Sequence, residues 1–150
     1  MGWFSRKPID PLADRVSAGD VVFHASHVRI RSSATDLRVP GAKRASRAVS
    51  LHRGSVLVTS DHLAISYRKW IAIDGRLRVD PAATAQVTFD AEGVHVTIDI
   101  TKAMADVPRK HSGVAVIDVA APIPPEALER LTARAVAVSP VQVSGIARRI

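Results

Sequence analysis

Apolar and polar residues alternate with a period of two through the middle of this 150-residue chain. In GSVLVTSDHLAISYRKW, residues 54–70, the alternation continues on both sides of a short polar break at Ser60 and Asp61. A period of two sends successive side chains to opposite faces of a β-strand, and a break that contains Asp suits a chain reversal. This stretch therefore predicts two antiparallel strands. The second strand should turn three side chains inward, namely Leu63, Ile65 and Tyr67.

Further strands are predicted before and after this stretch. Residues 21–33 alternate, and their first half is apolar on both faces, which favours either a β-bulge or a strand end that is covered on both faces. Residues 33–46 are rich in Ser, Pro, Gly and charge, so we expect a loop with the short strand DLRV inside it. Asp74-Gly75 is a hairpin signal, and AQVTFDAEGVHVTIDI predicts a second hairpin with Gly93 at its turn.

One amphipathic helix is predicted near the C-terminus, in APIPPEALERLTARAVA, residues 121–137. Two adjacent prolines suit its first turn. Its apolar stripe consists of Leu128, Leu131 and Ala135. Because Pro140 should prevent the helix from continuing, residues 138–150 are predicted to be a last strand or a basic tail.

Many short strands followed by one helix predict an α+β, mostly β, protein. We expect a small antiparallel β-barrel or sandwich with one C-terminal capping helix. A chain of this length forms one domain with a substantial core. Its organisation is predicted as an N-terminal tail over residues 1–9, a single domain over residues 10–137 and the C-terminal segment 138–150.

The composition excludes several classes of protein. The chain contains no cysteine, so it has no disulfide, thiolate nucleophile or cysteine-ligated zinc. No apolar window is long enough to span a membrane, and the N-terminal residues lack the apolar region of a secretory signal. We therefore expect a cytoplasmic protein without a transmembrane segment, which lies peripherally on a membrane when it binds one.

The positive charge is concentrated in one segment. The formal net charge is +7, and residues 27–53 carry seven cations against a single acid, Asp36. The cations are Arg29, Arg31, Arg38, Lys43, Arg44, Arg47 and Arg53. A field localised in this way favours an anionic partner, although a basic surface can also serve only to keep a protein soluble.

Three stretches together resemble bacterial pleckstrin-homology-like domains. They are GDVVFHASHVRI, RGSVLVTSDHLAIS and PPEALERLTARA, and the similarity covers about residues 19–137. The first is similar to the opening strand of that family, the second to its hairpin, and the third stands where the family has its closing helix. The resemblance implies a non-enzymatic scaffold that binds lipid headgroups or proteins.

The basic segment is the best candidate for a binding site. Arg29 and Arg31 are two residues apart on a predicted strand, so their side chains project from one face. Lys43, Arg44 and Arg47 are predicted to lie in the loop that follows. The resemblance implies that this loop meets phosphate groups. Arginine offers paired donors to phosphate, and lysine adds a point charge.

No catalytic or metal motif is recognisable. Ser60, Asp61 and His62 are consecutive, and a turn cannot arrange them as nucleophile, base and orienting group. His24 and His27 are three apart, which places them on opposite faces of a strand. Asp90 and Asp99 could face each other across their hairpin, where we expect them to be surface charges. We therefore predict no enzyme, no metal site and no cofactor.

The sequence thus favours a binding module for an anionic phospholipid surface or an acidic protein. Nucleic acid is a weaker candidate, because no aromatic residue interrupts the basic segment between Phe23 and Tyr67. The main alternative is a structural or assembly protein, such as a virion component, that forms homo-oligomers through strand edges and termini. The third hypothesis is an enzyme whose site is not recognisable from the sequence.

Overall fold

The computed structural model describes residues 10–15, 20–40, 45–107 and 110–150. The predicted N-terminal tail, Lys43 and Arg44 lie outside these residues. The described residues form eight strands, four helical segments and their connections. The strands are β1 (Val21–Arg38), β2 (Ala45–Thr59), β3 (His62–Tyr67), β4 (Trp70–Arg78), β5 (Ala85–Asp90), β6 (Gly93–Asp99), β7 (Ser112–Ala120) and β8 (Arg134–Val136).

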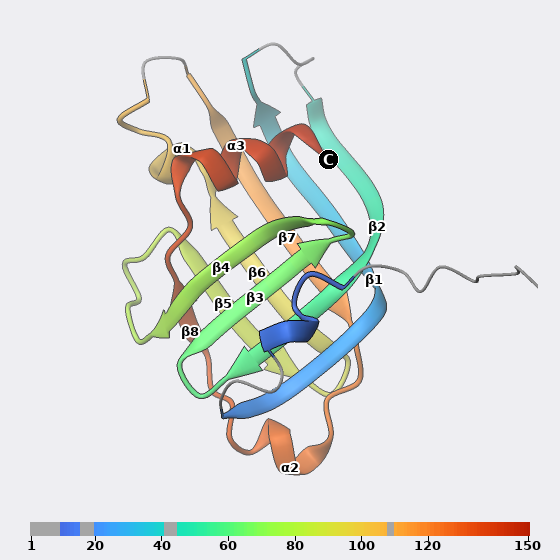
Figure 1. The fold of residues 1–150 in the computed structure, drawn as a ribbon. Helices are drawn as coiled ribbons and strands as arrows, with labels where there is room; N and C mark the ends of the chain where they lie inside the picture. The colour runs from blue at the N-terminus through green and yellow to red at the C-terminus, as the bar shows by residue number, and fades with distance from the viewer. Residues whose placement is uncertain (1–9, 16–19, 41–44, 108–109) are drawn as a thin grey trace, which may run out of the picture.

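The strands close into an antiparallel barrel (Figure 1). Their order around the barrel is β1-β2-β3-β4-β8-β5-β6-β7, and β7 pairs with β1 to complete the circle. Closure removes the two long edges that an open sheet would leave. The prediction of a mostly β protein built on a small antiparallel barrel is confirmed.

β1 and β2 are longer than the sequence predicts. β1 continues through the expected loop to Arg38, and β2 begins at Ala45, so Arg47 lies in a strand rather than in a loop. The prediction of a loop over most of residues 33–46 is therefore wrong. Polar residues are tolerated here because the outer face of these strands is exposed to solvent, which local composition does not reveal. The predicted bulge is confirmed by register shifts between Val21 and Phe23 and between Ala25 and Val28.

The β3–β4 hairpin turns at Arg68 and Lys69, and the prediction of a turn at Asp74-Gly75 is wrong. Both residues lie inside β4. The Asp74 carboxylate is used in ion pairs, described below. Gly75 allows a close approach, because a Cβ there would lie 2.6 Å from the carbonyl oxygen of Ala137. These two residues thus serve tertiary contacts rather than a reversal.

The β5–β6 hairpin is confirmed. Gly93 follows the turn with φ of 150°, a conformation that side-chain-bearing residues rarely adopt. A Cβ on Gly93 would also lie 1.8 Å from the carbonyl oxygen of Val119 on β7. Both observations explain why glycine occupies this position.

The C-terminal helix is present, and it lies later in the chain than predicted. The expected helix over residues 121–137 contains only the short α2 (Pro125–Leu128). Its second half includes β8, which pairs with both β4 and β5 and fills the gap between them. Tertiary pairing therefore overrides the local helical pattern.

Residues 138–150, predicted as a strand or tail, contain α3 (Pro140–Arg148). Ser139 caps this helix: its hydroxyl accepts from the amide of Gln142, and the Gln142 side chain accepts from the amide of Ser139. Pro140 occupies the first turn, where a proline is favourable. α3 lies across one end of the barrel beside α1 (Ile100–Ala103), and α2 lies at the opposite end (Figure 1).

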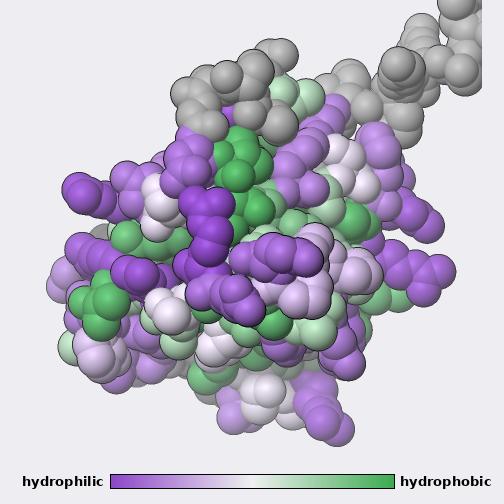
Figure 2. Space-filling model, turned by 90° about the horizontal axis from the view of Figure 1, so that it is seen from below, coloured by the Kyte–Doolittle hydropathy of each residue, from purple (hydrophilic) through white to green (hydrophobic). Residues whose placement is uncertain are grey.

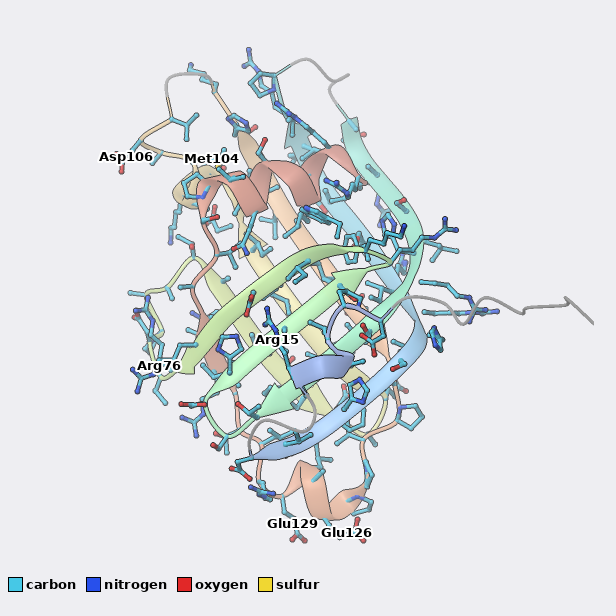
Figure 3. The ribbon with its side chains drawn as sticks, viewed as in Figure 1. Arg15, Arg76, Met104, Asp106, Glu126 and Glu129 are labelled. Carbon is cyan, nitrogen blue, oxygen red and sulfur yellow. The ribbon has the colours of Figure 1, made fainter. Side chains whose placement is uncertain are left out.

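One continuous core fills the barrel, and Leu63, Ile65 and Tyr67 belong to it as predicted. The outer face of β2, β3 and β4 carries a second, smaller cluster beneath the 3₁₀ helix η1 (Ala13–Arg15). Leu12 packs there against Leu57 and is fully buried. Figure 3 shows Arg15 over the same face. The helices of the described residues are too short or too polar to cross a bilayer.

Candidate anion-binding site

The β1 bulge and the β1–β2 register place two arginines directly opposite each other. His27 sits in the bulge with φ of 56°, and its carbonyl oxygen accepts a hydrogen bond of 3.2 Å from Nη1 of Arg53. Beyond the bulge the ladder resumes with Arg29 paired to Arg53. Both side chains are exposed on the outer face of the barrel. Like charges at directly opposed positions of an antiparallel pair repel each other.

Two further arginines reach the same place from other elements. Arg68 lies in the β3–β4 turn with φ of 54°, and its amide donates to the carbonyl oxygen of Arg53. Arg149 is the C-cap residue of α3. These four side chains, with Leu51, His52 and Tyr67, line a cavity of about 590 Å³, here named the arginine basin.

Aromatic rings form one wall of the arginine basin. The rings of His52 and Tyr67 are stacked, with centroids 4.4 Å apart and an interplanar angle of 7°. Trp70 meets Tyr67 edge to face at 5.6 Å, and the Arg149 guanidinium lies 3.6 Å from the centroid of the Trp70 ring. The cation–π contact fixes Arg149 at the rim of the basin.

Burial controls the protonation of this wall. It raises the pKa of Tyr67 to about 12, and the Tyr67 hydroxyl shares a buried hydrogen bond of 2.7 Å with the hydroxyl of Ser32. Burial also lowers the pKa of His52, and the backbone of Arg149 offsets part of this effect. Nε2 of His52 is buried and has no hydrogen-bond partner among the described residues. The wall is therefore neutral at pH 7, and the charge of the basin comes from its arginines.

No acidic side chain lines the arginine basin in the described part of the chain. Its four arginines also take part in none of the ion pairs found among residues 10–15, 20–40, 45–107 and 110–150. Arginines elsewhere do have partners: Arg15 pairs with Asp74, and Arg130 pairs with Asp20. An uncompensated cluster of guanidinium groups can bind an anion such as phosphate through several donors.

The predicted site residues are only partly brought together. Arg29 lines the arginine basin. Arg31 lies on the same exposed face, opposite Leu51 on β2 and Asp118 on β7, and is not part of the lining. Arg47 lies further along β2, opposite Thr35. Lys43 and Arg44 lie outside the described residues.

Three of the basin arginines are not among the predicted site residues. Arg53 was counted in the basic segment, but its position opposite Arg29 depends on the register across the bulge. Arg68 lies in the β3–β4 turn, whereas the hairpin signal in the sequence is at Asp74-Gly75. Arg149 lies 120 positions after Arg29 and reaches it only because α3 crosses the end of the barrel. No local signal in the sequence connects these residues.

A second polar cluster contains Ser, His and Asp but has the wrong geometry for a catalytic triad. Oδ2 of Asp10 accepts from the Ser26 hydroxyl at 2.6 Å and lies 3.1 Å from Nε2 of His24. The same Nε2 lies 3.3 Å from the Ser26 hydroxyl, whereas a triad uses opposite ring nitrogens for its serine and its acid. Oδ1 of Asp10 accepts from Ser55 and from the amide of Leu12. The cluster therefore fixes residues 10–12 to the barrel.

Two other histidines are held by carboxylates. Nε2 of His62 lies 2.5 Å from Oδ1 of Asp74, which also accepts from Arg15. The two nitrogens of His95 contact Asp118 at 2.7 Å and Asp90 at 2.8 Å.

Asp90 pairs with Gly93 at the turn end of the β5–β6 hairpin, so Asp90 and Asp99 do not face each other across it. Asp99 lies at the other end, where it caps α1. Among the described residues, no group of three His, Asp or Glu side chains is arranged to hold a metal ion.

Large apolar side chains are exposed beside the arginine basin. Leu51, in its lining, is 74% exposed, and Val49 on the same face of β2 is 56% exposed. By contrast, the face that Figure 2 shows from below is covered largely by hydrophilic side chains, with smaller hydrophobic areas between them. Exposed apolar residues next to a cluster of cations are typical of membrane or protein contacts.

No family model, curated protein or solved structure matches this chain.

Proposed function

We propose that this protein is a non-enzymatic binding module that attaches peripherally to an anionic membrane by taking phosphate groups into the arginine basin. The observation that carries the proposal is the direct opposition of Arg29 and Arg53, joined by Arg68 and Arg149, without an acid in the lining of the described site. The repulsion between these guanidinium groups is relieved when an anion lies between them.

A membrane suits the surroundings of the basin better than an acidic protein does. Leu51 and Val49 stand exposed beside the arginines, where they can enter the interfacial layer while the guanidinium groups meet phosphates. Glu126 lies on α2 and Glu129 is its C-cap residue, and both are at the end of the barrel opposite α3 (Figure 3). Docking through the basin therefore keeps these acids away from an anionic surface.

The resemblance to bacterial pleckstrin-homology-like domains supports the same proposal. An antiparallel barrel with a C-terminal helix across one end is the architecture that the resemblance implies. The helix is α3 rather than the expected segment 121–137, and β8 adds a strand where that helix was placed. We therefore propose a pleckstrin-homology-like membership with an altered C-terminal region.

Vesicle co-sedimentation tests the proposed function. Wild-type protein should bind vesicles of phosphatidylglycerol and phosphatidylcholine, bind pure phosphatidylcholine weakly, and lose binding as salt is raised. The double variant Arg53→Gln/Arg68→Gln should bind about 30-fold more weakly, since each cation near an anionic surface contributes roughly 1 kcal/mol.

The matched control removes the same charge elsewhere. Arg76 is exposed on the side of the barrel away from the C-terminus (Figure 3), and Arg134 lies on β8. Arg76→Gln/Arg134→Gln should keep most of the binding. Equal losses in both double variants would show that only net charge matters, and unchanged binding of Arg53→Gln/Arg68→Gln would refute the basin as the site.

A homo-oligomer is the second candidate, and one observation favours it. β3 pairs with β2 only from Gly54 to Val58, so residues 45–53 of β2 pair with β1 alone among the described strands. An unpaired edge of this kind can add a strand from another copy of the chain. Light scattering over a range of concentrations separates the candidates: a dimer disrupted by Val49→Lys would support assembly, and a monomer throughout would exclude it.

A further inference from the structure

An apolar groove adjoins the arginine basin. It has a volume of about 660 Å³ and lies between α3 and the residues that follow α1. Its apolar side chains are those of Pro40, Trp70, Met104, Val107, Pro140 and Val141. Volumes of roughly 300–1,000 Å³ with mostly apolar walls are usual for small-molecule sites.

Arg149 stands at the boundary between the two cavities and lines both. Its guanidinium rests on the Trp70 ring, and its Nη1 donates to the carbonyl oxygen of Gly145 at 2.9 Å. The side chain is therefore held from the α3 side and the β4 side together. A cation in this position can contact a negative group in the basin while apolar atoms continue past it into the groove.

We propose that the apolar groove holds the aliphatic chain of an amphiphile whose terminal phosphate lies in the arginine basin. The proposal rests on the proposed function, because it takes phosphate binding in the basin as given. It adds that the protein takes up an individual phosphate-headed lipid chain in addition to contacting the plane of a bilayer.

Charge complementarity favours an amphiphile with a phosphate head over other ligands of the groove. The two arginines of the groove, Arg148 and Arg149, come from the end of α3 that meets the basin. The other polar residues of its described lining are His111, Gln142 and Ser144, and no described lining residue is acidic. A chain with one anionic end matches this polarity. A chain with a cationic end would place its charge among four arginines.

A series of n-alkyl phosphates tests the inference by isothermal titration calorimetry. Inorganic phosphate is the first member, and butyl, hexyl, octyl and decyl phosphate follow, each below its micelle concentration. Affinity should rise about fourfold for each CH₂ that enters the groove, and should level off when the groove is full. Octyltrimethylammonium, with the same tail and the opposite charge, should not bind.

Two variants distinguish binding of the phosphate in the basin from binding of the aliphatic chain in the groove. Ser144 lines the groove but not the basin, and Ser144→Phe should flatten the dependence on chain length while leaving the affinity for inorganic phosphate within about twofold. Val79 is exposed and directly follows the last residue of β4, and Val79→Phe is the control that adds the same side chain elsewhere. Arg68→Gln should lower the affinity for every phosphate in the series by the same factor.

The outcomes distinguish the two proposals. Equal affinities for inorganic and alkyl phosphates, with normal vesicle binding, would overturn the groove inference and leave the proposed function intact. Binding of octyltrimethylammonium as tight as that of octyl phosphate would also overturn it. If neither phosphates nor anionic vesicles bind, the proposed function itself fails. A chain-length dependence that Ser144→Phe removes and Val79→Phe keeps would support the inference.

Discussion

Arg29 on β1 and Arg53 on β2 occupy directly opposed positions in an antiparallel ladder, and no described acid lies in the cavity that they line. Opposed like charges weaken a strand pair. The arrangement is therefore unfavourable for the folded protein alone and becomes favourable when an anion is bound. Conflict between stability and local charge is common where a site is kept for binding.

Removal of one of these charges should stabilise the empty protein. We expect Arg29→Gln to raise the free energy of unfolding by about 0.5 kcal/mol at low salt, since it relieves the repulsion with Arg53. Added phosphate should raise the melting temperature of the wild type and have less effect on the variant. Thermal and urea unfolding with and without phosphate measure both effects. Arg76→Gln is the control, and a destabilised Arg29→Gln would contradict the account.

The Asp10 carboxylate should anchor residues 10–15 to the barrel, and this stabilisation should depend on pH. Burial alone would raise its pKa, but hydrogen bonds from Ser26 and Ser55 outweigh burial and lower the pKa to about 2. The side chain is only 9% exposed. Because the folded pKa lies below the ordinary value of 3.8, the stabilisation is present above pH 3.8 and is lost as the pH falls towards 2.

The expected loss in Asp10→Asn is about 2 kcal/mol at pH 7. Urea unfolding should show the difference from wild type narrowing between pH 4 and pH 2. Asp106→Asn, at an exposed carboxylate (Figure 3), should leave stability unchanged. A difference between Asp10→Asn and wild type that stays constant with pH would mean that the carboxylate is not responsible.

His95 should contribute stability with the opposite pH dependence. Burial disfavours its charged form, but the carboxylates of Asp118 and Asp90 outweigh burial and raise its pKa above 6.5. A raised folded pKa gives stabilisation that is complete below pH 6.5 and is lost as the pH rises through the folded value. We expect less than about 1 kcal/mol, because the pair is partly exposed. NMR titration of the imidazole, and unfolding of His95→Gln at pH 6 and pH 9, measure the effect; a pKa below 6.5 would contradict it.

The N-cap of α3 should influence the distant arginine basin. Ser139→Ala removes the capping box and should destabilise α3 by about 1 kcal/mol. Since Arg149 ends this helix, binding of anionic vesicles should weaken as well, although residue 139 does not line the basin. Ser139→Asp, which retains an N-cap acceptor, should restore both properties. Loss of stability without any loss of binding would show that α3 does not position Arg149.

The barrel could be predicted from sequence because its signal is local. Alternation assigns Leu63, Ile65 and Tyr67 to the core, and the turn at Gly93 is specified by residues beside it. The errors arise where tertiary contacts decide. Asp74-Gly75 has the composition of a turn but lies in a strand, because Asp74 binds Arg15 and Gly75 lies under Ala137.

In the C-terminal region, strand pairing and helix-start signals determine the structure more than the amphipathic stripe does. The apolar stripe over residues 121–137 predicts a long helix. Residues 134–136 instead form β8, because they pair with both β4 and β5. The sequence Ser139-Pro140-Val141-Gln142 contains both a capping box and a first-turn proline, so it marks the start of a helix. Pro140, which predicts the end of the preceding helix, instead begins α3.

The candidate site was the least predictable part. Of the residues predicted from the concentration of charge, Arg29 lines the basin, whereas Arg31 and Arg47 lie outside the lining. The other basin arginines come from β2, a hairpin turn and the end of α3, and only barrel closure brings them together. The positions of these arginines depend on strand register and long-range packing, and neither can be derived from the number of charges in a segment.

The most direct test of the central claim is an NMR titration of the labelled protein with inorganic phosphate and then with vesicles that contain phosphatidylglycerol. We expect the largest shifts at the side-chain Nε groups of Arg29, Arg53, Arg68 and Arg149, with little change at Arg76. The account is contradicted if these four resonances stay in place while others shift, or if all arginines of the surface respond alike.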